Sequence, residues 1–128
     1  RFAVALHGTD TPAVRDEIER LADDVLLPIV GETLRSNLDP PQVTGGLQLD
    51  GEGMAFSAAA PAERGEWIML RCVNRRDHPT RGRWRMSRTL SEAVRARLDE
   101  TPLEPLVVDG DAVSFDAGPR EIVTILVR

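Results

Sequence analysis

Apolar and polar residues alternate through most of the second half of the chain. At residues 81–86, Gly82, Trp84 and Met86 fall on one side of the alternation and arginines fall on the other. This period of two predicts an antiparallel strand with one buried and one solvated face. Further short strands are predicted at residues 54–58, 67–74, 92–98, 106–108 and 113–115.

The final segment has a different pattern. Residues 121–127 are almost continuously apolar and rich in β-branched side chains, and Gly118-Pro119 just before them marks a turn. A run that is apolar on both faces is typical of a strand buried on both sides. We therefore expect the last element to be a central strand of the core.

One helix is predicted, near the N-terminus at about residues 12–27. Thr11 is a favourable N-cap and Pro12 a favourable first helical residue. Apolar residues then recur at helical spacing. A short strand is expected before the helix, at residues 2–6.

These elements predict a mainly β fold, an antiparallel β-sandwich of about seven strands with one N-terminal helix. Residues 36–46 are rich in Pro, Gly and polar residues and indicate a connector. We expect residues 1–40 to pack on a sandwich formed by residues 41–128, as one compact unit. Because Arg1 falls inside an expected strand, we also expect the chain to be part of a longer polypeptide.

The amino-acid composition indicates the cellular compartment. Cys72 is the only cysteine, which excludes an intrachain disulfide and favours a reducing compartment. No apolar run approaches the ~18 residues of a membrane span. All 16 basic residues are Arg, which fits a genome-level codon bias. We expect a cytoplasmic, bacterial protein without a membrane partner.

The arginines are concentrated in the middle of the chain, where residues 64–97 hold ten Arg and three acids. Arg81, Arg83 and Arg85 form a stripe on one predicted strand, and Arg95 and Arg97 are candidates for a neighbouring strand. Such a face can bind phosphates. It lacks interleaved aromatic residues, however, and both flanks of the chain are acidic. We favour a solvated or interdomain face and expect no nucleic-acid partner.

Carboxylates offer one candidate for chemistry, because glycoside hydrolysis uses two of them across one bond. Asp99, Glu100 and Glu104 flank Pro102 and can in principle converge. Nothing in their spacing requires convergence, so we favour solvated turn acids.

The remaining reactive residue types are isolated. His7 and His78 are about seventy residues apart, and neither has neighbours at metal-ligand spacing. Cys72 lies on the apolar side of a predicted strand, where a small core residue is expected. We therefore predict no catalytic, cofactor-binding or metal-binding residue in this chain.

Four segments in order carry a family resemblance: residues 56–65, 67–74, 93–103 and 118–127. The second, Trp-Ile-Met-Leu-Arg-Cys-Val-Asn, resembles a strand in the C-terminal region of glycoside hydrolase family 38 α-mannosidases. The other three are similar to the lead-in, a later segment and the closing strand of that region. Residues 1–8 and the helix after them also resemble the stretch that precedes it.

The resemblance implies that catalysis belongs to another part of the parent protein. In that family, the zinc ligands and the reactive carboxylates belong to an N-terminal catalytic barrel. The chain alone is then not an enzyme, and its partner is that catalytic domain of a zinc-dependent retaining α-mannosidase. The sandwich would support the barrel, and it would contact carbohydrate only as part of the parent protein.

Two polar residues match the family strand, Arg71 and Asn74. One interpretation is that they hold strand ends and turns together, and the other is that they contact the catalytic domain. With Arg81, Arg83 and Arg85, they are the candidate interdomain residues. An alternative function is a free-standing carbohydrate-binding module, in which Trp67 would be the test residue, because sugars stack on aromatic rings.

Overall fold

The computed structural model describes residue 4 and residues 6–26, 46–63 and 65–128. The chain divides into two compact units, Arg1–Pro41 and Gln42–Arg128. Packing of the first unit on the second stays a prediction. The strand expected at residues 2–6 lies mostly outside the described residues, and Val4 and Leu6 are exposed and not in a strand.

The helix of the first unit, α1, spans Pro12–Leu26. Its start is capped as the sequence predicted, since the Thr11 hydroxyl accepts a hydrogen bond from the Val14 N–H at 3.3 Å. The Arg15 guanidinium folds back to Asp10 and donates to its carboxylate at 2.6 Å. No helix in the described part of the chain has the length and apolar character that a membrane span requires.

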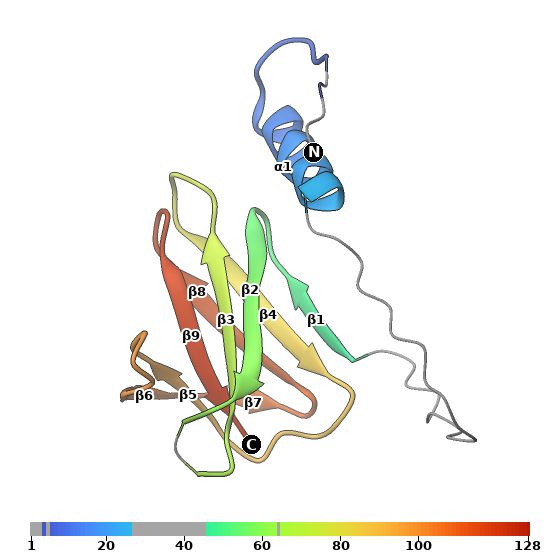
Figure 1. The fold of residues 1–128 in the computed structure, drawn as a ribbon. Coiled ribbons are helices and arrows are strands. Elements are labelled where there is room, and N and C mark those ends of the chain that lie inside the picture. The colour runs from blue at the N-terminus through green and yellow to red at the C-terminus, as the bar shows by residue number, and fades with distance from the viewer. Residues whose placement is uncertain (1–3, 5, 27–45, 64) are drawn as a thin grey trace, which may run out of the picture. The chain divides into compact units, whose positions relative to one another are not determined.

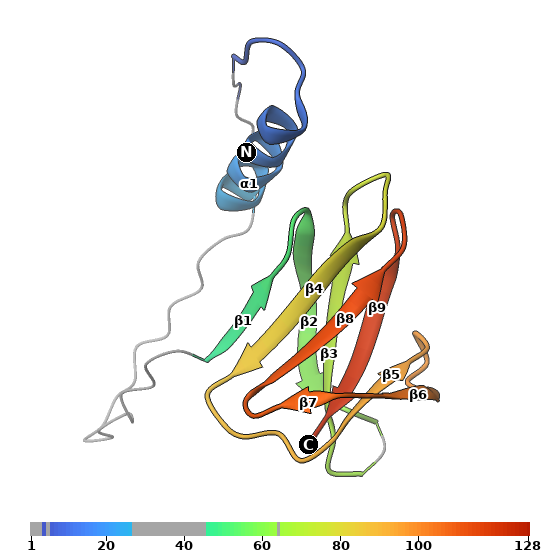
Figure 2. The same ribbon diagram turned by 180° about the vertical axis from the view of Figure 1, so that it is seen from behind.

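The second unit contains two antiparallel sheets that face each other, which confirms the predicted β-sandwich (Figure 1). The strand order is β1-β4-β8-β7 in the four-stranded sheet and β2-β3-β9-β5-β6 in the five-stranded sheet. The strands are β1 (Leu47–Asp50), β2 (Met54–Pro61), β3 (Ile68–Asn74), β4 (Thr80–Met86), β5 (Ala93–Ala96), β6 (Pro102–Leu106), β7 (Val108–Asp109), β8 (Ala112–Ala117) and β9 (Ile122–Val127). Figure 2 shows the four-stranded sheet in front.

The closing strand β9 is the middle strand of the five-stranded sheet, as its composition predicted. It pairs with β3 on one side and β5 on the other. Every residue of β9 after Ile122 is buried. Because β9 hydrogen-bonds on both edges and packs on both faces, it unites the two halves of this sheet.

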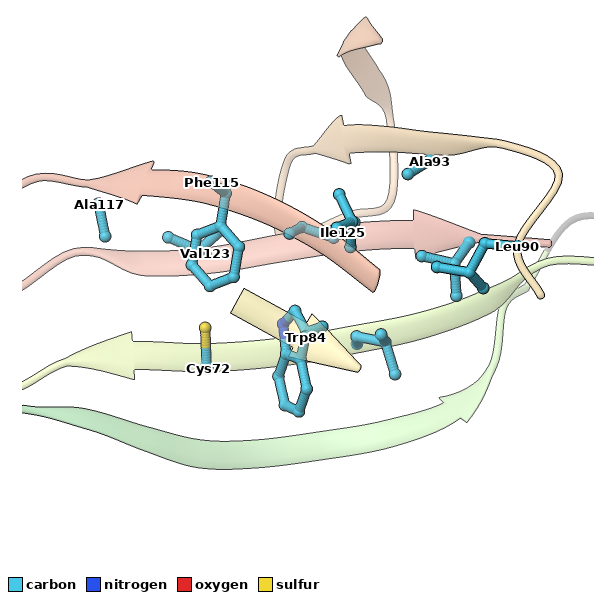
Figure 3. Packing of buried hydrophobic residues seen from close by; sticks show 11 residues of the cluster. Cys72, Trp84, Leu90, Ala93, Phe115, Ala117, Val123 and Ile125 are labelled. Carbon is cyan, nitrogen blue, oxygen red and sulfur yellow. The ribbon is translucent and has the colours of Figure 1, made fainter. Parts of the chain in front are cut away.

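The main core lies between the sheets and is centred on Trp84, which is fully buried (Figure 3). Trp84 projects from β4, and Leu70 and Cys72 project from β3, on the faces that the alternation predicted. The buried residues of this cluster are Leu70, Cys72, Trp84, Leu90, Ala93, Val113, Phe115, Ala117, Val123, Ile125 and Val127.

A smaller apolar cluster lies on the other face of the five-stranded sheet. It contains Met69, Ala96 and Leu126, each at most 7% exposed, and Trp67 packs against it. Met69 pairs with Leu126 across β3 and β9. This outer face is therefore apolar at one end, where the loops on either side of it meet.

Strands β1 and β6 were not predicted, whereas β7 falls in the predicted hairpin of residues 106–108 and 113–115. Nine strands are present in the described ranges rather than about seven. Pro102 and Pro105 both lie in β6, and proline within a run argues against a strand. The strand forms because it is the edge of its sheet, where one side of the backbone needs no partner. The opposite edge strand, β2, carries a β-bulge between Phe56 and Ala58.

Gly82 fills a position that no larger residue fits. It pairs with Phe115 across β4 and β8, and a Cβ atom on Gly82 would lie 2.4 Å from the Phe115 ring. The ring is 3% exposed and so has little freedom to move aside. The glycine thus allows an aromatic ring to lie over the strand backbone.

We expect Gly82→Ala to lower the free energy of unfolding by about 2 kcal/mol, because overpacking a filled core displaces side chains or backbone. Urea denaturation followed by circular dichroism measures this change. Gly46→Ala is the matched control, since nothing lies within 4 Å of the added Cβ there. Equal midpoints for the two variants would contradict the role assigned to Phe115.

Candidate functional site

Asn74, at the end of β3, ties together one end of the sandwich. Its side chain is fully buried and donates to the carbonyls of His78 at 2.9 Å and Gly118 at 2.7 Å. Its own carbonyl oxygen accepts from the Arg76 N–H at 2.9 Å. Asn74 therefore joins the β3–β4 loop to the β8–β9 turn. Contact with another domain stays a prediction for this residue.

The same turn is held by Glu121. One carboxylate oxygen accepts from the Gly118 N–H at 2.6 Å, and the other pairs with the Arg95 guanidinium at 2.5 Å. Arg95 also donates to the carbonyl of Asp116 at 2.7 Å and is only 17% exposed. Arg95 is thus committed to internal contacts that link β5 to the ends of β8 and β9.

Arg71 lies on the outer face of the five-stranded sheet. Its guanidinium donates to the Thr124 hydroxyl at 3.1 Å and to the carbonyl of Leu98 at 2.8 Å. Leu98 begins the turn between β5 and β6. Arg71 therefore anchors this turn to the sheet, and its predicted contact with another domain remains untested.

Arg81, Arg83 and Arg85 share the outer face of the four-stranded sheet, on the side opposite to Trp84. Arg83 pairs with Asp109 at 2.8 Å, whereas Arg81 and Arg85 are exposed. Acidic residues lie directly across the sheet: Asp50 is opposite Arg83 and Asp116 is opposite Arg81. The face is thus one of mixed charge.

The expectation that Arg95 and Arg97 lie beside this stripe is wrong. β4 pairs with β1 and β8, whereas β5, which contains Arg95, belongs to the other sheet. Sequence spacing gave no information on which sheet each strand joins. The five arginines therefore do not form one continuous basic face.

The structure brings two of the predicted carboxylates together at a pocket of about 180 Å³ on the outer face of the five-stranded sheet. Asp99 and Glu100 line the pocket, whereas Glu104, on β6, does not. Glu63 joins them from the β2–β3 loop. The complete lining is Glu63, Trp67, Val94, Asp99, Glu100, Thr101, Pro102 and Leu126.

Hydrogen bonds fix the two loops that form this pocket. The Glu63 N–H donates to the Glu100 carboxylate at 2.7 Å across 37 residues of sequence. Glu100 has a φ of 63°, and its N–H donates to the Arg97 carbonyl at 2.9 Å, which closes the β5–β6 turn. The left-handed backbone at Glu100 is costly for a residue with a Cβ, so the local contacts must hold it.

Asp99 is hydrogen-bonded inside the same turn. Its carboxylate accepts from the Thr101 N–H at 3.1 Å. Hydrogen bonds from Thr101 hold the pKa of the Asp99 carboxyl below its ordinary value. The group is therefore ionised at neutral pH and acts only as an acceptor there.

Trp67 forms the aromatic part of the pocket. The Arg128 guanidinium lies 4.6 Å from the centre of its ring, a cation–π contact. Arg128 in turn donates to the Glu92 carboxylate at 2.8 Å. The indole is thus held in place by a charged pair, with Arg128 directly after β9 and Glu92 directly before β5. No feature of the sequence placed Glu63, Trp67 and Arg128 near one another, because three separate loops and strand ends meet here.

Cys72 is a core residue rather than a nucleophile. It is fully buried between the sheets, and burial raises the pKa of the thiol to about 12. A thiol with this pKa is neutral at physiological pH and unreactive.

Within the described ranges, no three His, Cys, Asp or Glu side chains are grouped so that they can hold a metal ion. The described residues therefore do not fit a zinc ligand set, which requires at least three protein ligands in a catalytic site. His78 pairs with the neighbouring Asp77 at 3.2 Å in the β3–β4 loop, far along the chain from His7.

Two antiparallel sheets around one apolar core define the second unit as a β-sandwich domain. Residues 53–125 match the C-terminal beta sandwich domain of the glycosyl hydrolases family 38. The match covers more than half of the 128 residues, and the chain belongs to this family. The resemblance found in the sequence is thereby confirmed. Comparison with curated proteins gave no match.

We expect Asn74→Ala to lower the free energy of unfolding by about 3 kcal/mol, because it leaves buried backbone groups without their side-chain partners. Thr80→Val is the matched control, since it removes an exposed hydrogen bond from a side chain to the carbonyl of Glu52. Its expected cost is about 0.5 kcal/mol or less. Urea denaturation of both variants measures the difference, and similar losses would contradict the anchoring role of Asn74.

Alkaline pH should destabilise the domain through Cys72 alone. The chain has no Lys and no Tyr, and Arg keeps its proton, so no other side chain titrates between about pH 9 and pH 12. The folded thiol has the higher pKa, so its contribution to stability is complete below the unfolded pKa of about 8.5. The free energy of unfolding then falls by about 1.4 kcal/mol per pH unit as the pH rises towards 12.

Urea denaturation between pH 7 and pH 11 measures this slope. Cys72→Ala is the control, since it should unfold with a flat pH profile despite its lower overall stability. The same alkaline slope in both proteins would show that the thiol is not the group responsible.

Proposed function

We propose that this chain is the non-catalytic C-terminal sandwich of an α-mannosidase, and that it supports the catalytic region during mannoside hydrolysis. The observation that carries the proposal is the family match over residues 53–125, on a fold whose core is complete within its own two sheets. The bond-breaking chemistry then belongs to another part of the protein, which would also hold the zinc ion.

The pKa shifts of the carboxyl groups support the assignment of catalysis to another part of the protein. A glycosidase general acid needs a carboxyl whose pKa is raised, so that it carries a proton at working pH. Among the described carboxyls, those with a clear shift are Asp10, Asp77 and Asp99, and in each case the pKa is lowered by hydrogen bonds from its neighbours. Such groups accept protons poorly and do not donate them.

The outer face of the four-stranded sheet is the surface proposed to contact the catalytic region. Arg81 and Arg85 are exposed there, and Asp116 opposite Arg81 and Asp50 opposite Arg83 give a face of mixed charge. Interfaces between domains are more polar than a core, so a flat charged sheet is suitable. The same acids weaken the alternative of nucleic-acid binding, which needs a continuous basic field.

A free-standing carbohydrate-binding module is the second candidate function. The pocket beside Trp67 favours it, because an aromatic ring and carboxylates are the groups that hold sugar rings. The two functions are compatible, and they differ in whether the isolated chain binds sugar. For either role we propose a cytoplasmic, bacterial protein.

The isolated chain should not hydrolyse an aryl α-mannoside, with or without added zinc. Release of the aryl group is followed by absorbance, and a complete family 38 enzyme serves as the positive control. Turnover by residues 1–128 that disappears in Asp99→Asn or Glu100→Gln would refute the proposal.

Charge reversal on the proposed contact face should weaken association with the catalytic region. We expect Arg81→Glu with Arg85→Glu to reduce co-purification of the two separately expressed parts by at least about tenfold, since like charges across an interface are costly. Arg97→Glu is the matched control, because this arginine is also exposed but lies by the other sheet. Equal losses for both proteins would exclude this face as the contact.

A further inference from the structure

We infer that the pocket beside Trp67 binds one hexose ring of a mannoside. This inference rests on the proposed function, which supplies mannosides as the ligand class. It assigns a binding role to side chains on the outer face of the five-stranded sheet.

The lining has the two kinds of surface that a sugar ring needs. Trp67, Val94, Pro102 and Leu126 give the lining apolar surface, against which the C–H groups of a hexose can pack. Glu63, Asp99 and Glu100 add carboxylates to the same lining. The volume of about 180 Å³ suits a single ring rather than an oligosaccharide.

The charges of the lining side chains also restrict the class of ligand that can bind. Carboxylates accept hydrogen bonds and do not donate when ionised, and sugar hydroxyls are donors, so the two are complementary. Asp99 is ionised at neutral pH because Thr101 stabilises its charged form. Three acids would repel a phosphate or a carboxylate ligand. In this part of the sandwich no three of these side chains are arranged to hold a metal ion, so a neutral sugar ring is the best fit.

The pocket is also preorganised, which lowers the entropic cost of binding. Arg128 and Glu92 fix the indole, and the bond from Glu63 to Glu100 fixes the two loops relative to each other. Arg71 holds the β5–β6 turn through the Leu98 carbonyl. A ligand would therefore meet a site that is already formed.

Titration of residues 1–128 with methyl α-mannoside and with mannobiose tests the inference. Isothermal calorimetry should show saturable binding with a Kd of about 1–10 mM, as expected for a ligand of one ring. Intrinsic fluorescence should change in parallel. The chain has two tryptophans and Trp84 is fully buried, so Trp67 is the responsive fluorophore.

Two variants locate the site. Trp67→Ala should weaken binding at least tenfold, and Asp99→Asn, which keeps the size of the side chain, should weaken it severalfold. Phe56→Ala is the matched control, since this aromatic residue is 58% exposed and does not line the pocket. Its affinity should stay within about twofold of the parent value. Circular dichroism establishes that each variant is folded.

Absence of saturable binding up to about 50 mM sugar would overturn the inference. So would binding that survives in Trp67→Ala, or equal binding of glycerol. None of these three results bears on the proposed support of a catalytic region, because that role is tested separately by turnover and by association of the two parts.

Discussion

The pairing of β9 with both of its neighbours is the constraint on which the sandwich depends. β9 is the last strand in sequence, yet it is the middle of the five-stranded sheet and its side chains enter both apolar clusters. The strands on its two sides, β3 and β5, have no direct pairing with each other. The sheet is therefore incomplete until the chain has reached its final strand, and non-local contacts of this kind are formed late and slowly.

Polar side chains fix the loops that the apolar core leaves unpaired. Asn74 and Glu121 satisfy the backbone of the loops at one end, and Arg71 holds the β5–β6 turn. Of these contacts, the bond from Arg71 to the Leu98 carbonyl helps to position the pocket, whereas Asn74 and Glu121 order loops at the other end of β3. The arrangement explains why residues that match a family strand need not touch substrate: their hydrogen bonds shape the surface that other residues form.

Much of the fold could be predicted because alternation, turns and a doubly apolar strand are local signals. Trp84, Cys72 and the closing strand lie where the pattern placed them. The missed elements have non-local causes. β6 is a strand because it lies at a sheet edge, despite Pro102 and Pro105, and Arg95 lies in the other sheet from Arg81. The pocket could not be predicted from the sequence for the same reason, since Glu63 and Glu100 meet only after three strands have paired.

The two outer strands of the larger sheet have a consequence for how this domain can meet other proteins. β2 carries a bulge at Ser57 and ends at Pro61, and β6 contains two prolines. Interrupted borders of this kind resist the addition of a further strand from another molecule, which protects against ordered aggregation. For this sheet, recruitment of a neighbour is therefore expected through its outer face or its loops, where side chains rather than backbone decide which neighbour is accepted.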